Sequence, residues 1–236
     1  MERAPFLEVQ ELKETQSFRR LLRTHFPLNK LRMSEKAKYI YVARNPWDTC
    51  VSCYHLIREC PPCNFANGTF DDFLDAFIDA QVGFGDYFDH VISGFNHIKD
   101  RNVFFVTYED LQRNKKEVVL RLAYFLGEDH GKVLEENEDL FQRVLDKSTV
   151  GFMKGILRAN PKGGLKVLAN NSPQLQPATV IENQKSCGTN DVHIIRKGVV
   201  GGWKQHLTQE NLEKMRATII QRTKGSDVID LWKYDC

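Results

Sequence analysis

Short apolar runs alternate along the chain with segments whose apolar residues recur at helical spacing. The segments Lys38–Ala43 (KYIYVA) and Val103–Thr107 (VFFVT) are apolar and aromatic over a few residues only, which predicts two buried β-strands. Strands that alternate with helices are typical of an α/β protein with a mainly parallel sheet flanked by helices. Because a chain of 236 residues is long enough for one sizeable core, we expect a single domain over residues 1–236.

Signals for helix starts accompany the amphipathic segments. Pro46 suits the first helical position, where its missing N–H needs no partner, and it predicts a helix from about Trp47 to Glu59. Thr69 and Asp72 resemble a capping box and start an amphipathic helix that is expected to end before Gly83. Helical periodicity predicts two further helices, Lys115–Leu126, ended by Gly127, and about Thr208–Thr223.

Residues Pro161–Asp191 have a different composition. They are rich in Gly, Asn, Ser, Pro and Gln, and their periodicity is weak. Loops of this length inside compact domains are usually lids or disordered segments. We therefore expect a long mobile loop within the domain.

Charge and hydropathy exclude two classes of partner. The chain has 33 basic and 31 acidic residues and a net charge of +2, whereas a general nucleic-acid binder carries a clustered basic excess. No apolar run approaches the roughly 20 residues that span a bilayer. The first 14 residues also lack the apolar stretch of a secretory signal. We expect a soluble protein with reduced cysteines, and any anion site must be local.

Two C-x-x-C pairs, Cys50 with Cys53 and Cys60 with Cys63, raise the alternative of a zinc site. Six residues separate the pairs, whereas zinc ribbons use about 15–20. The first pair also lies inside a predicted helix. We therefore expect no metal at these cysteines.

The strongest candidate for an anion site follows the first strand. Arg44 stands at the carboxyl end of that strand, and Ser52 comes eight residues later in the next helix. Ligands of open α/β sheets bind at this end, beside helix N-termini whose dipoles favour anions. An Arg side chain offers phosphate a bidentate fork, and Ser adds a neutral donor. The alternative is a surface ion pair for Arg44 and an ordinary helical role for Ser52.

Two further motifs carry candidate chemistry. Arg196, Lys197 and Gly198 place two cations beside a residue that lets backbone approach a phosphate closely, although a lone R-K-G is also typical of a solvated turn. His25, in R-T-H-F-P, is a candidate general base at the end of a strand-like stretch, because imidazole titrates near neutrality. The alternative for His25 is a hydrogen-bonded structural histidine.

Four segments in a fixed order resemble the cytosolic sulfotransferases. They are Arg20–Pro27 (RLLRTHFP) preceded by Arg3–Glu8 (RAPFLE), Lys38–His55 (KYIYVARNPWDTCVSCYH), Val103–Leu111 (VFFVTYEDL) followed by Leu122–Gly127, and Ile195–Lys204 (IRKGVVGGWK). The resemblance implies the sulfotransferase fold, which is similar to that of P-loop nucleotide hydrolases. It also implies sulfonate transfer from 3′-phosphoadenosine 5′-phosphosulfate (PAPS) to a hydroxyl or amine of a small phenol, alcohol or amine. Detoxification, a cytoplasmic location and independence of metals follow from the same resemblance.

The resemblance assigns roles residue by residue. Arg44 and Ser52 match the residues that hold the nucleotide's 3′-phosphate, and Arg196, Lys197 and Gly198 match a second clamp on the same group. His25 matches the general base, and Arg23 stands where the family has a Lys, so that the cation is kept without the compact ammonium. Other matches to nucleotide contacts are Tyr108, Ser148, Thr149 and Met153, and Phe6 matches a wall of the acceptor pocket.

This sequence departs from the family at several positions. Val150 replaces a Phe that stacks on adenine, and Gly202 replaces an Asp. Lys204, Thr208 and Glu213 fit the family's dimer motif K-x-x-x-T-V-x-x-x-E, but Gln209 stands in place of Val. A homodimer is therefore one of the states that the resemblance allows. Ser148 and Thr149 are also typical of ordinary helix caps.

One motif of the family does not occur in the 236 residues. The loop T-Y-P-K-S-G-T-T-W, whose backbone amides and Lys cradle the 5′-phosphosulfate, normally precedes R-x-P-F-L-E, and no K-S-G-T is found. Three alternatives follow: an N-terminally incomplete sequence of an active enzyme, a pseudoenzyme or binding module that keeps the 3′-phosphate half-site, and a nucleotide kinase-like phosphotransferase. The last is the weakest, because it also requires a phosphate loop.

Overall fold

The computed structural model describes Leu7 and residues 21–60, 63–156 and 195–233. Phe6 and the expected loop Pro161–Asp191 lie outside these residues. In chain order the elements are η1 (Leu28–Lys30), β1 (Tyr39–Ala43), α1 (Pro46–Arg58), α2 (Phe70–Ile78), α3 (Tyr87–Phe95), β2 (Val103–Thr107), α4 (Tyr108–Arg113), α5 (Lys115–Leu126), α6 (Glu128–Glu136), α7 (Glu138–Lys147), α8 (Val150–Ile156), η4 (Gly202–Gln205), α10 (Gln209–Arg222) and η5 (Val228–Trp232).

Strands β1 and β2 pair in parallel, in a register that runs from Tyr39 opposite Val103 to Ala43 opposite Thr107. Both strands and their parallel pairing were predicted correctly. The expectation that β1 is buried on both faces was wrong, because Ile40 and Val42 are 42% and 55% exposed. On the other face, Tyr41 is buried because its ring stacks on Phe105 at 5.3 Å and packs against α3.

Helix α1 begins where the sequence predicts. The side chain of Asn45 accepts a hydrogen bond from the N–H of Asp48, and Pro46 occupies the first turn. Helix α2 likewise starts with Thr69 as its cap, but it ends at Ile78, earlier than the expected limit at Gly83. The chain turns away at Ala80, whose φ of 58° lies in the left-handed region.

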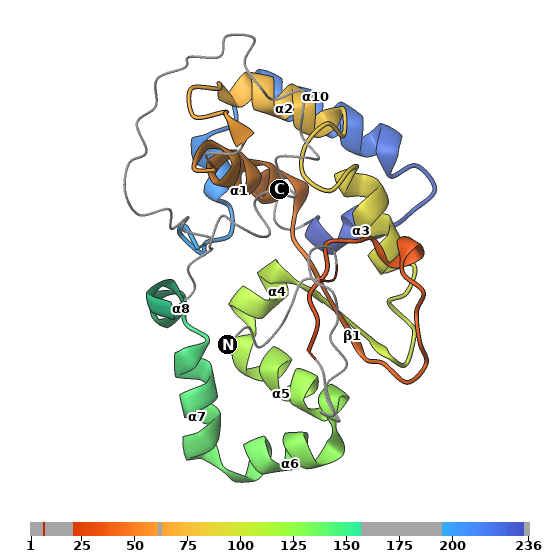
Figure 1. Cartoon of the computed structure of the whole chain (residues 1–236), viewed down its shortest axis with the longest axis vertical. Helices are drawn as coiled ribbons and strands as arrows, with labels where there is room; N and C mark the ends of the chain where they lie inside the picture. Colours follow the sequence, from red (N-terminus) through yellow and green to blue (C-terminus); the bar gives the residue numbers. More distant parts are fainter. Residues whose placement is uncertain (1–6, 8–20, 61–62, 157–194, 234–236) are drawn as a thin grey trace.

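The helices divide into two groups on either side of the strands (Figure 1). Helices α1, α2, α3 and α10 gather in the upper part of the view, and α2 and α10 lie side by side and in contact. Helices α4, α5, α6 and α7 follow one another through the lower part. The main core belongs to the first group and includes Trp47, Phe73, Phe88, Met215 and Trp232, each at most 4% exposed.

The second group surrounds a smaller core of Phe104, Val106 and Val118. Helix α5 has the predicted bounds. It ends at Gly127 in an extended conformation, with φ of 171°, and not in the left-handed turn usual for a terminal glycine. Helices α6 and α7 were not predicted from the sequence. In α7 the signal was present, because Leu140, Phe141, Val144 and Leu145 recur at helical spacing. Helix α6 carries mostly polar residues, so its period is harder to recognise. In the described part of the chain, no helix is both long and apolar enough to cross a bilayer.

Candidate functional site at the carboxyl end of the sheet

Both strands end at the same edge of the sheet, and this edge brings predicted residues together. Arg44 follows β1 and Tyr108 follows β2, and the guanidinium carbon of Arg44 lies 4.6 Å from the centre of the Tyr108 ring. This is the geometry of a cation–π contact. The parallel register therefore makes neighbours of two residues that are 64 positions apart in the sequence.

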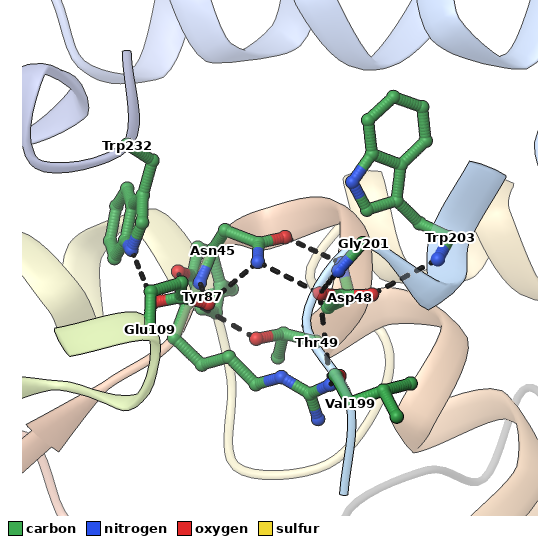
Figure 2. A network of polar contacts seen from close by, with 10 residues as sticks. Asn45, Asp48, Thr49, Tyr87, Glu109, Val199, Gly201, Trp203 and Trp232 are labelled. Atoms are coloured by element: carbon green, nitrogen blue, oxygen red, sulfur yellow. Dashed lines mark hydrogen bonds and ion pairs between the residues drawn. The ribbon is translucent and has the colours of Figure 1, made fainter. Parts of the chain in front are cut away.

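Behind this edge lies a buried polar network formed by Asn45, Asp48 and Glu109 (Figure 2). The side-chain amide of Asn45 donates to Asp48 Oδ2 at 3.0 Å and to Glu109 Oε1 at 2.6 Å. The backbone N–H of Asn45 donates to the same Glu109 oxygen at 3.1 Å. Buried carboxylates are costly unless hydrogen-bonded, and here their oxygens accept several N–H donors.

The network extends to the C-terminal part of the chain. Asp48 accepts hydrogen bonds from the backbone N–H groups of Gly201 at 2.8 Å and Trp203 at 3.0 Å. The indole N–H of Trp232 donates to Glu109 Oε2 at 2.8 Å (Figure 2). The segment that carries Arg196 and Lys197 is thus anchored against the first turn of α1.

Arg44 is fixed by the same segment. Its Nη2 donates to the carbonyl oxygen of Val199 at 3.0 Å and lies 3.7 Å from Asp48 Oδ2. The Nε of Arg44 is buried and has no hydrogen-bond partner within the described residues. A partly buried cation with a buried, unused donor atom suits an anionic ligand, since such a donor is normally satisfied.

Gly198 lies very close to another segment of the chain, as its place in the R-K-G motif suggests. Its φ is 67°, and a Cβ atom at this position would come within 2.3 Å of the Val150 side chain. Only glycine fits both conditions readily. The start of α8, which directly follows the predicted nucleotide contacts Ser148 and Thr149, therefore packs on the R-K-G turn.

A cavity of about 490 Å³ opens beside Arg44 and contains three of the predicted residues, His25, Arg44 and Ser52. Its other walls are largely apolar or aromatic, and they include Leu56, Phe77, Val82, Phe84, Tyr87 and Val91. Ligand pockets have this character, with few polar groups among apolar walls. Tyr108, Arg196, Lys197 and Gly198 do not line this cavity.

His25 is held on two sides. Its ring stacks on Phe84, with centroids 3.9 Å apart and planes inclined by 2°. Its backbone carbonyl lies 2.9 Å from Nε2 of His90, so that nitrogen must carry the proton. Nδ1 of His90 is then an acceptor for the hydroxyl of Tyr41 at 2.6 Å. Burial lowers the pKa of His90, in agreement with a neutral ring.

His90 is a positioning residue for His25 that the sequence analysis missed. It lies on α3, 65 residues from His25, and its neighbours in the sequence form no recognisable motif. The backbone carbonyl of Arg23 accepts a hydrogen bond from the N–H of Leu7 at 2.8 Å.

Ser148 and Thr149 use their hydroxyls locally. Ser148 donates to the carbonyl of Leu145 at 2.7 Å, and Thr149 donates to that of Asp146 at 2.8 Å. Both residues therefore act as helix-terminal residues between α7 and α8, the alternative recognised from the sequence. Met153, one turn further along α8, is partly buried.

A pair of histidines, also missed from the sequence, borders the basic segment. His55 Nε2 on α1 lies 3.4 Å from His206 Nε2, which follows η4. Burial and then the positive charges of Arg196, His206, Arg58 and Lys197 lower the pKa of His55 to about 4. The pKa of His206 is lowered by burial and by Arg196 and Lys197. Positive charge from the R-K-G turn thus adds to burial in keeping both histidines neutral.

The cysteines do not converge on one point. Cys60 and Cys63 contact each other, with their Sγ atoms 2.9 Å apart, whereas Cys53 lines the cavity and Cys50 is buried in α1. No group of three or more His, Cys, Asp or Glu side chains in the described residues is arranged to hold a metal ion.

Comparisons with known proteins all identify the same family. A family model described as the sulfotransferase domain matches residues 1–227. The amine sulfotransferase of Oryctolagus cuniculus is 30% identical over 238 residues, which cover 98% of this chain and 71% of that protein. Sulfotransferase 2B1 of Homo sapiens is 32% identical over 210 residues, which cover 87% of this chain and 50% of the relative.

Solved structures agree on the fold. A mouse sulfotransferase, SULT7A1, complexed with PAP superimposes with a TM-score of 0.70 at 26% identity and covers 92% of this chain and 70% of its own. Retinol dehydratase in complex with androsterone and the inactive cofactor PAP gives a TM-score of 0.67 at 24% identity, which shows a shared fold. The chain spans 50% to 71% of the length of these four proteins.

The network predicts that Glu109→Gln is strongly destabilising although it is isosteric. The new amide places a donor against the donors of Asn45 or Trp232, so we expect a loss of about 1–3 kcal/mol in the free energy of unfolding. The measurement is urea denaturation followed by tryptophan fluorescence. Glu138→Gln is the matched control, because this carboxylate is 69% exposed and pairs only with Lys116. We expect it to lose less than about 1 kcal/mol, and equal losses would contradict a structural role for Glu109.

The lowered pKa of His55 predicts an acid-sensitive fold. A histidine whose folded pKa of about 4 lies below its unfolded value of 6.5 contributes stability that is fully present above pH 6.5 and is lost as the pH falls towards 4. We expect the free energy of unfolding to decline over this range in the wild type and to decline less in His55→Gln and in Arg196→Ala. Urea melts at steps between pH 7 and pH 4 provide the measurement. Identical pH profiles for all three proteins would refute this origin.

Proposed function

The chain belongs to the sulfotransferase family, and on this premise we propose that it binds PAPS and transfers sulfonate from it to a hydroxyl or amine of a small phenol, alcohol or amine. The observation that carries the proposal is the placement of Arg44, a partly buried cation with an unused donor at the carboxyl end of β1. It shares one cavity with Ser52 and His25. The cavity thus combines an anion-binding group with a titratable base.

In this proposal the 3′-phosphate of the nucleotide lies between Arg44 and the R-K-G turn. Arg44 offers a charge-assisted donor and Ser52 a neutral one. Arg196 and Lys197 add positive charge, which together with burial lowers the pKa of His55. Gly198 lets the backbone approach closely. Tyr108, Ser148, Thr149 and Met153 then belong to the remainder of the nucleotide site, with Val150 offering packing without a π-face.

His25 is proposed as the general base that accepts the proton of the attacking hydroxyl or amine. Its stacking on Phe84 and the bond from His90 to its carbonyl fix the ring and the backbone, so that a neutral ring nitrogen can be presented to the cavity. Arg23 would neutralise negative charge near the transferred group, and Phe6 would add an acceptor wall. The apolar walls of the cavity favour an aromatic or aliphatic acceptor.

The chemistry is an in-line transfer, driven mainly by positioning and by electrostatic stabilisation of the leaving phosphate. The 236 residues contain no K-S-G-T segment to hold the 5′-phosphosulfate. A homodimer formed through Lys204–Glu213 and a cytoplasmic location stay predictions. Thr208 in that segment caps α10 by accepting a bond from Asn211 N–H at 3.2 Å.

Arg44→Ala and Arg196→Ala are each expected to weaken binding of 3′-phosphoadenosine 5′-phosphate. Each removes a charge-assisted contact to phosphate, worth about 1.5–3 kcal/mol. Calorimetric titration measures the loss, and adenosine 5′-phosphate, which lacks the 3′-phosphate, is the ligand control.

Arg121→Ala is the matched protein control, because this arginine of α5 is 53% exposed and pairs with Asp110 and Glu117, neither of which is assigned to the nucleotide site. The 3′-phosphate assignment fails if the Arg44 and Arg196 variants lose equal affinity for both nucleotides. It also fails if Arg121→Ala loses as much as they do.

The 236-residue polypeptide by itself is expected to transfer sulfonate poorly. One lost oxyanion-type donor costs about 10²–10³ in rate, and the phosphosulfate loop supplies several donors and a Lys. Adding an N-terminal strand and K-S-G-T loop should restore transfer, measured with labelled PAPS and a panel of phenols and amines. Robust turnover by the unextended polypeptide would show that the loop is not needed.

In the extended protein, His25→Ala should remove most of the rate and leave nucleotide affinity nearly unchanged. The reason is that His25 acts on the acceptor proton and does not hold the nucleotide in this proposal. His97→Ala is the control, because His97 is an exposed residue that pairs with Asp100. A His25→Ala protein with full activity would eliminate the general-base role.

A further inference from the structure

Cys60 and Cys63 form a pair of neighbouring thiols directly after α1. Their Sγ atoms are 2.9 Å apart, and the thiol of Cys63 donates to the sulfur of Cys60. Neither cysteine is in a disulfide bond. A disulfide requires an S–S distance of about 2.05 Å, so a shift of about 1 Å joins the two sulfurs.

The local backbone keeps the two thiols together. The N–H of Cys60 donates to the carbonyl of Ile57 at 3.1 Å, and the N–H of Cys63 donates to the carbonyl of Cys60 at 2.9 Å. Asn64 then adopts a left-handed conformation with φ of 49° and directs the chain away. A backbone hydrogen bond between Cys60 and Cys63 therefore supports the contact between their two sulfur atoms.

The chain beyond the pair is tied back to the same helix. Arg58 Nε donates to the carbonyl of Ala66 at 3.1 Å, and the Tyr54 hydroxyl donates to the carbonyl of Gly68 at 3.2 Å. A bond between the sulfurs would add a covalent link to a connection that already has a defined geometry. Little reorganisation should oppose it.

The two thiols are chemically unequal. The hydrogen bond from Cys63 lowers the pKa of Cys60, while donating that bond and burial raise the pKa of Cys63. The thiolate is the reactive form of cysteine. Cys60 is thus suited to attack an oxidant, and Cys63 is suited to resolve the product.

We propose that Cys60 and Cys63 are a reversible dithiol–disulfide site that is oxidised by hydroperoxides. The Cys60 thiolate attacks the peroxide, forms a sulfenic acid and releases hydroxide, which takes up the proton lost from the thiol to give water. The sulfur of Cys63 then attacks the sulfenic sulfur, its proton leaves with the hydroxyl as a second water, and the S–S bond forms. Two thiols and one hydrogen peroxide thereby give one disulfide and two waters. The proposal does not depend on sulfonate transfer.

Burial sets the expected selectivity among oxidants. Cys60 is 1% exposed and Cys63 is 2% exposed, so a reagent reaches them only through local opening of the surrounding structure. Hydrogen peroxide is small, whereas glutathione disulfide must bring a tripeptide against the attacking sulfur. We therefore expect peroxide to oxidise the folded protein at least ten times faster than glutathione disulfide at equal concentration.

The test treats the reduced 236-residue chain with hydrogen peroxide, blocks the remaining thiols with iodoacetamide and maps the cysteines by peptide mass spectrometry. We expect a Cys60–Cys63 disulfide that is lighter than the dithiol by two hydrogen atoms and that dithiothreitol reverses. In Cys63→Ser, dimedone should label Cys60 as a trapped sulfenic acid. In Cys60→Ser, labelling of Cys63 should be at least ten times lower. Cys50→Ser is the matched control and should still form the disulfide.

The wild-type mapping does not depend on the folding of any variant. The proposal is overturned if Cys60 and Cys63 stay as reduced as Cys50 after peroxide treatment, or if they pair with other cysteines instead. Equal dimedone labelling in the two Ser variants would overturn the division of roles. About one tightly bound zinc per chain, found by elemental analysis, would show that the thiols serve a metal instead.

Discussion

The buried carboxylates of Asp48 and Glu109, joined through the side chain of Asn45, are the constraint on which the rest of the structure depends. Both lie in the interior, where a carboxylate is tolerated only if donors surround it. The donors come from Asn45 just before α1, from the Gly201–Trp203 segment and from Trp232. Segments from three distant parts of the sequence must therefore assemble before these charges are satisfied.

The same arrangement explains why the anion-binding groups gather at one place. Asp48 fixes the segment that follows Arg196 and Lys197, and the carbonyl of Val199 in that segment fixes Arg44. Arg44, held in this way, cannot turn freely towards solvent. The pKa values of His55 and His206 are lowered first by burial and then by the positive charges of Arg196 and Lys197. An anion that binds here would relieve repulsion among groups that the fold has already brought together.

A second set of contacts fixes the residues around the cavity. It consists of aromatic stacking and of hydrogen bonds made by a histidine. Phe84 covers the ring of His25, while Tyr41 and His90 fix the backbone beside it. Tyr87 donates its hydroxyl to the carbonyl of Arg44, so that the acceptor side and the anion side of the cavity share one wall. Preorganisation of this type removes reorganisation from the reaction step.

The sequence by itself determined the elements whose signals are local. Pro46, Thr69 and Thr208 set helix starts to within a residue, and the two apolar runs became parallel strands. His25, Arg44 and Ser52, which the motifs singled out, line one cavity in the structure. Only the tertiary structure decided the features that depend on long-range contacts. They include the exposure of one face of β1 and the hydrogen bonds that Glu109 accepts in the interior. They also include the hydrogen bond of His90 to the carbonyl of His25 and the contact between His55 and His206. The physical reason is that a hydrogen bond between residues separated by 60 to 150 positions leaves no periodicity or turn signal in the sequence around either partner.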